Sequence, residues 1–187
     1  MENIILEKTA KDLLYIISCA INHVAIEEYK LKTINFESVF ELASKHMLRT
    51  AVAISLELSG VKNEVTAAAI VAGVRRTVIF EKSWSIISSE FEKEGIWYLP
   101  LKGMVIKNYY PKVAMREFSD YDILFDKSMA CKVRNIMESL GYTTESFGIN
   151  NDDLYYKAPV LNFEMHRELI HPKHGDLFYE YYKTINK

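Results

Sequence analysis

The stretch REFSDYDILF, residues 116–125, decides the fold of the part of the chain around it. In an extended strand, successive side chains point to opposite faces. Asp120 and Asp122 therefore share one face, while Tyr121 and Ile123 point the other way. We predict a strand whose apolar face packs on helices and whose opposite face presents two neighbouring carboxylates.

The two carboxylates are candidate metal ligands. Side by side they repel each other, and one would tend to remain protonated unless a cation is bound. Mg2+ prefers hard oxygen ligands and commonly binds one or two carboxylates, water and substrate phosphates. Asp120 and Asp122 thus predict a Mg2+ site, with Mn2+ as a second candidate ion. An isolated pair with this spacing is also typical of a solvated strand face.

A second candidate strand carries a third carboxylate. In residues 161–166, LNFEMH, the apolar residues alternate with Asn162, Glu164 and His166. Glu164 on a neighbouring strand would complete a site with Asp120 and Asp122. We expect His166 to support that site through a hydrogen bond near Asp122 or Glu164. An exposed strand face is the alternative interpretation.

A third feature lies upstream, at Lys102-Gly103 in the stretch LPLKG. A glycine between a strand and a helix allows a phosphate to approach the backbone closely. Free N–H groups at the start of a helix favour anions, and Lys102 adds a cation. An ordinary turn glycine beside a surface lysine is the alternative.

The periodicity divides the chain into two regions and predicts an α+β protein. Residues 1–94 read as helices, with Asn35 and Asn63 as N-caps and Gly60 as a left-handed residue after a helix end. An aromatic and apolar row at helical spacing is predicted to be core: Phe80, Trp84, Ile87 and Phe91. Residues 95–187 follow the order β-α-β-α-β-β. The predicted strands are 96–101, 121–125, 154–157 and 160–166, and the predicted helices are 103–110 and 129–140.

These features occur together in a known family. Residues 99–126 and 160–168 resemble the uncharacterised nucleotidyltransferase family of the polymerase-beta superfamily. That family is similar in carrying three motifs in this order: L-K-G, then R-x-x-x-D-x-D-x-L, then a strand with the pattern hydrophobic-E-hydrophobic-H. Residues 1–94 are compatible with the family but carry no diagnostic motif. The resemblance implies a minimal nucleotidyltransferase core with a small mixed sheet. Because family members are generally longer, we expect a core shortened at its C-terminus.

The resemblance also implies a mechanism and a set of roles. Asp120, Asp122 and Glu164 would hold divalent metal and be catalytic. Lys102, Gly103 and Arg116 would bind the nucleotide phosphates; for Arg116, a salt bridge that orients Asp120 or Asp122 is the alternative. A nucleoside monophosphate would pass from a nucleoside triphosphate to an unidentified acceptor, which is a small molecule, a protein or an RNA end.

Two competing hypotheses accompany the enzyme. The superfamily usually has Gly-Ser where this chain has Lys102-Gly103, which motivates a catalytically inactive nucleotide-binding or regulatory module of the same fold. His166, His171 and His174 near Glu164 motivate a zinc hydrolase. Pro172 disfavours that hypothesis because it breaks a helix that would gather the three histidines.

Bulk properties restrict the class of protein. The hydrophobic fraction of 49% supports a packed core, and 23 basic against 25 acidic residues argue against nucleic-acid binding by bulk charge. No stretch approaches the roughly 20 apolar residues of a membrane span. Cys19 and Cys131 are expected to be buried free thiols in a reducing compartment. We therefore expect a cytoplasmic protein with no membrane partner, and the apolar helical half leaves a homo-oligomer open.

Overall fold

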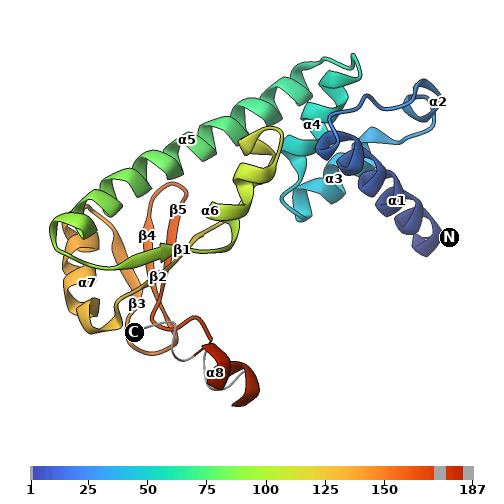
Figure 1. Cartoon of the computed structure of the whole chain (residues 1–187). Coiled ribbons are helices and arrows are strands. Elements are labelled where there is room, and N and C mark those ends of the chain that lie inside the picture. Colours follow the sequence, from blue (N-terminus) through green and yellow to red (C-terminus); the bar gives the residue numbers. More distant parts are fainter. Residues whose placement is uncertain (1, 171–175, 183–187) are drawn as a thin grey trace. The chain divides into compact units, whose positions relative to one another are not determined.

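The computed structural model describes residues 2–170 and 176–182 and has the expected α+β composition. The helices of this described part are α1 (Glu2–Ile21), α2 (Glu28–Leu31), α3 (Phe36–Lys45), α4 (Arg49–Leu58), α5 (Glu64–Lys93), α6 (Lys102–Ile106), α7 (Ala130–Ser139) and α8 (Asp176–Tyr182). The strands are β1 (Tyr98–Pro100), β2 (Tyr121–Phe125), β3 (Thr143–Ser146), β4 (Asp152–Lys157) and β5 (Leu161–His166). Figure 1 shows these elements along the chain.

The chain forms two compact units that are discontinuous in sequence. The first comprises residues up to Thr77 together with Ile106–Phe118, and the second comprises Val78–Val105 and the residues from Ser119 onward. Helix α5 contributes residues to both units. These units do not coincide with a single boundary between residues 94 and 95, because the second half of α5 packs with the sheet.

The first unit is helical, and its helix ends follow the capping residues of the sequence. The Asn35 side chain accepts a hydrogen bond from the Ser38 N–H at the start of α3, and Asn63 accepts one from the Thr66 N–H in α5. Gly60 has a φ of 82° just after α4, in the left-handed region that favours glycine. A core of buried residues joins the helices: Leu13, Ile16, Cys19, Ile26, Ile34, Val39, Ala43, Val52 and Leu56.

The second unit contains a mixed five-stranded sheet with the order β1-β2-β5-β4-β3 (Figure 1). Strand β2 pairs with β1 in antiparallel and with β5 in parallel orientation. Strand β4 is antiparallel to both β5 and β3. The predicted order lacked β3 and began β4 two residues late, because the polar stretch Thr143–Ser146 gives no apolar alternation. The sheet places the central strands β2 and β5 side by side.

One face of the sheet carries an aromatic core. Phe80 on α5 packs on Tyr121 and Phe163, with ring centroids 4.7 and 6.0 Å apart. Trp84 stacks on Phe163 at 6.4 Å, and Tyr142 meets the same ring edge-on at 5.6 Å. The predicted α5 row is therefore core, and it covers one face of β2 and β5. The opposite face is left for polar side chains.

The structure tests two further expectations, which concern the burial of the cysteines and the presence of a membrane-spanning helix. Both cysteines are free; Cys19 is buried as expected, whereas Cys131 is exposed, so its prediction is wrong. Cys131 is the second residue of α7, whose buried face is formed by Ala130, Val133 and Met137. In the described part of the chain, no helix combines the length and apolar character that a membrane crossing requires.

Candidate functional site

Asp122 lies at the centre of the sheet, in β2. All five residues of this strand are buried, so the Asp122 carboxylate is held among packed neighbours rather than in bulk water. The Asp122 carbonyl accepts a hydrogen bond of 2.9 Å from the Leu101 N–H, which ties the residue to the chain segment that follows β1. Strand alternation turns Tyr121 and Ile123 into the aromatic core and Asp122 to the other face. The backbone thus fixes where this carboxylate points.

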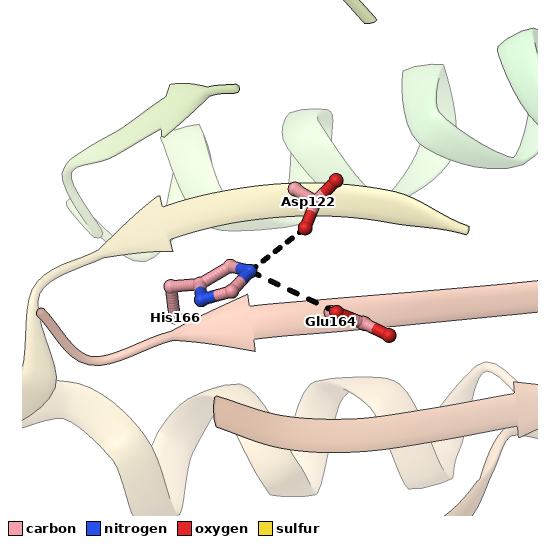
Figure 2. Close-up of side chains that lie close together, drawn as sticks. All are labelled: Asp122, Glu164 and His166. Atoms are coloured by element: carbon pink, nitrogen blue, oxygen red, sulfur yellow. Dashed lines mark hydrogen bonds and ion pairs between the residues drawn. The ribbon is translucent and has the colours of Figure 1, made fainter. Parts of the chain in front are cut away.

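Glu164 and His166 meet Asp122 from the neighbouring strand. The parallel register places Glu164 directly beside Asp122, and His166 beside Leu124. His166 Nε2 lies 2.9 Å from Asp122 Oδ1 and 3.9 Å from Glu164 Oε2 (Figure 2). One ligand atom from each of Asp122, Glu164 and His166 lies within 4.8 Å of the others. The hydrogen bond that the sequence led us to expect for His166 is present.

Asp120 is placed just outside this group of three. It is the residue that precedes β2 and is half-buried. Its negative charge acts on the site, since it helps to raise the pKa of Glu164 and that of Lys102. The structure therefore brings the charge of Asp120 to the site, while the tight group consists of Asp122, Glu164 and His166.

Lys102 lies against the carboxylate of Asp122. Its Nζ donates a hydrogen bond of 2.6 Å to Asp122 Oδ1. Lys102 is also the first residue of α6 and has a φ of 43°, so the left-handed position of the Lys102-Gly103 pair is the lysine. Gly103 is buried within this five-residue helix. Arg116 belongs to the first unit, where its Nη1 donates to the Glu117 carbonyl, and its role toward phosphate stays a prediction.

The electrostatics of the two carboxylates differ. Burial disfavours the ionised form of Asp122, but hydrogen bonds from His166 and Lys102 outweigh it and hold its pKa below the usual range. Burial and the negative charges of Asp120 and Asp122 raise the pKa of Glu164. Burial also opposes the charge on Lys102, yet its hydrogen bond to Asp122 raises its pKa overall. The surroundings therefore stabilise the ionised form of Asp122 and destabilise the ionised form of Glu164.

This donor set fits a divalent cation. Carboxylate oxygens of Asp122 and Glu164 converge with an imidazole nitrogen, and Asp120 adds negative charge nearby. A cation bound here would relieve the repulsion that raises the pKa of Glu164. Oxygen ligands suit Mg2+ and Mn2+, and the contact with His166 Nε2 helps to fix the orientation of the Asp122 carboxylate. The residues present thus fit a divalent cation.

Sequence reasoning missed a further acidic residue, Asp152. The structure begins β4 at Asp152 and pairs this residue with His166, and its charge adds to the raised pKa of Glu164. The predicted strand began at residue 154, so the alternation was not extended to Asp152. The ion pair between Lys102 and Asp122 was also missed, because it joins residues 20 positions apart. His171 and His174 of the zinc hypothesis lie outside the described residues.

Comparison with known proteins agrees with the motifs. A family model described as an uncharacterised nucleotidyltransferase matches residues 31–186. No curated protein and no solved structure matches the chain. The matched region includes most of the helical part and the whole sheet, and therefore every candidate site residue. The chain belongs to this uncharacterised nucleotidyltransferase family.

Proposed function

We propose that the chain transfers a nucleoside monophosphate from a nucleoside triphosphate to an acceptor, with Mg2+ or Mn2+ as the metal. One observation carries the proposal: Asp122 and Glu164 are paired in register on β2 and β5, with His166 Nε2 2.9 Å from Asp122. A structural ion pair does not need two carboxylates on the same face of adjacent central strands. Such a pair does provide the one or two carboxylates by which Mg2+ is commonly bound together with substrate phosphates.

Each side chain then has a distinct task. Asp122 and Glu164 hold the metal, with Asp120 as the third carboxylate, and His166 orients Asp122. Lys102 and Gly103 bind phosphate oxygens. The metal, when bound, neutralises the charge that develops on the reacting phosphate.

The reaction follows from these positions. The acceptor hydroxyl would lie beside Glu164, and its oxygen would form a bond to the α-phosphorus. The bond from that phosphorus to the β-phosphate oxygen breaks, and pyrophosphate leaves with the electron pair. The hydroxyl proton passes to the carboxylate of Glu164, which is partly exposed and returns it to water. In-line placement of the two oxygens is the main contribution of the protein.

A catalytically inactive nucleotide-binding or regulatory module is the second candidate function. The ion pair between Lys102 and Asp122 favours it, because the chain itself supplies a cation to the central carboxylate. Retention of both Asp122 and Glu164 favours the enzyme, since a binding module does not require two metal ligands.

The test uses the full chain with four α-labelled nucleoside triphosphates, Mg2+ and cell extract as the source of acceptors. Transfer is supported by a labelled product that disappears with Asp122→Asn. The matched control is Glu145→Gln, which removes an exposed carboxylate from β3 in the same unit. Tight nucleotide binding without any labelled product would instead support the inactive module. Absence of both would refute both functions.

A further inference from the structure

Lys102 contacts the site through its charged end. Its side chain is 62% exposed, whereas the side chain of Asp122, which it contacts, is 6% exposed. The ammonium nitrogen lies 2.6 Å from Asp122 Oδ1. Since most of the Lys102 side chain is exposed, little packing opposes a movement of the ammonium group away from Asp122. The ion pair is therefore the main contact that keeps this ammonium group in place.

The same oxygen of Asp122 has a second partner. His166 Nε2 lies 2.9 Å from Asp122 Oδ1, so both polar contacts of Asp122 with the neighbouring side chains converge on one atom. A metal that binds this oxygen must displace one of them. The His166 side chain is 15% exposed and lies on the central strand β5, whereas Lys102 is exposed and lies at the start of a five-residue helix. Lys102 is the group that can leave.

We propose that Lys102 is an intramolecular counter-ion that Asp122 exchanges for a complex of divalent metal with triphosphate. Free metal then binds weakly, and metal and triphosphate bind cooperatively. This inference rests on the proposed function and specifies the form in which that site takes its metal.

The cooperativity follows from the partners that each ligand offers. A free cation replaces Lys102 at Asp122 but leaves the ammonium group without its hydrogen-bonded carboxylate. A metal–triphosphate complex supplies a cation to Asp122 and phosphate oxygens to Lys102 in one step. Since coupling between two ligands is reciprocal, triphosphate must strengthen metal binding by the same factor by which metal strengthens triphosphate binding. Lys102 is the residue that creates this coupling.

The test compares binding of Mn2+ alone with binding of the Mn2+–tripolyphosphate complex, measured by electron paramagnetic resonance and calorimetry. The variant is Lys102→Asn, because asparagine is neutral and tolerates a left-handed backbone. We expect it to bind free Mn2+ roughly tenfold more tightly and the complex roughly tenfold more weakly than the unmodified chain. Lys102→Arg, which keeps the charge, should restore the preference for the complex.

Two controls separate the possible failures. Lys132→Asn removes an exposed lysine that pairs with Glu94 and should change neither affinity. Unchanged or weaker binding of free Mn2+ by Lys102→Asn would overturn the proposal that metal replaces Lys102 at Asp122. If the unmodified chain still bound the complex and Asp122→Asn abolished that binding, the proposed metal site would survive that result. If the unmodified chain bound neither Mn2+ nor the complex, both the inference and the proposed function would fail.

Discussion

The two faces of the sheet in the second unit have opposite characters, although the same strands form both. On one face, Tyr121 and Phe163 are fully buried among aromatic rings. On the other, Asp122, Glu164 and His166 gather polar atoms within 4.8 Å of one another. Neighbouring residues of β2 and β5 thus belong to different environments, because strand side chains alternate.

Residues that pack the core and residues that form the candidate site therefore alternate along the same strand. The aromatic face stabilises the fold through burial. On the polar face, burial together with the like charges gathered there raises the pKa of Glu164. Substitutions on the first face should therefore reduce the free energy of unfolding. Substitutions on the second should change ligand binding, with smaller effects on stability or effects of the opposite sign.

The largest effect is expected on the aromatic face. Phe163→Ala removes a ring that contacts those of Phe80, Trp84, Tyr121 and Tyr142. We expect the free energy of unfolding to fall by about 3–5 kcal/mol, since a buried aromatic ring is replaced by a cavity. Urea unfolding followed by tryptophan fluorescence measures this change. A loss below about 1 kcal/mol would contradict the assignment of this face as the main core of the unit.

The next effect is expected on the polar face, one residue away. Glu164→Gln should weaken binding of the Mn2+–triphosphate complex by about 10- to 100-fold, because a charged ligand is lost. The raised pKa of Glu164 means that the folded state disfavours its ionised form. At neutral pH the neutral glutamine should thus leave stability unchanged or raise it. The control Glu145→Gln should alter neither quantity, and a large loss of stability would break the comparison.

A smaller effect concerns the pH dependence of stability in the presence of a chelator. The pKa of Asp122 is lowered from its ordinary value of 3.8, so its ionised form stabilises the folded state above that pH. This contribution is lost as the pH falls through the pKa of the folded state. We expect Asp122→Asn to be less stable by about 1 kcal/mol at pH 7. The difference should shrink as the solution is acidified, and a constant difference would show that packing is responsible.

The smallest effect is again on the aromatic face. Tyr155 is fully buried in β4, and its hydroxyl has no hydrogen-bond partner in the part of the chain that the structure describes. Burial raises the pKa of this phenol, which is consistent with a dry surrounding. Tyr155→Phe removes the unsatisfied group and should stabilise the fold by up to about 1 kcal/mol. A loss of stability in thermal unfolding would reveal a hydroxyl contact and sharpen the description of this face.

Local features of the fold were predictable from the sequence. Asn35 and Asn63 accept the expected hydrogen bonds at the starts of α3 and α5, and Gly60 is left-handed. These features depend on residues within one helical turn, so the sequence contains all the necessary information. The alternation in residues 121–125 likewise predicted β2 with the bounds that the structure has.

Features that depend on partners distant in the chain were harder to predict. Alternation assigned Asp122 and Glu164 to polar faces, but it did not fix the parallel register that places them side by side. Asp152 was missed because the first two residues of its strand are recognised only through pairing with β5. Lys102 was assigned to phosphate because the local pattern contains no information about its contact with Asp122. The predicted strand faces thus agree with the structure, whereas the predicted contacts between residues were incomplete.

The parallel pairing of β2 and β5 also sets when the site forms. Parallel strands cannot be joined by a tight hairpin, and here α7, β3 and β4 separate the two strands along the chain. Asp122 and His166, 44 positions apart, meet only when this long loop closes. Closures of this kind belong to the slow steps of folding. A nascent chain that has completed β2 but not β5 therefore holds half of the proposed metal site, and on this proposal metal would bind at the end of folding rather than at its beginning.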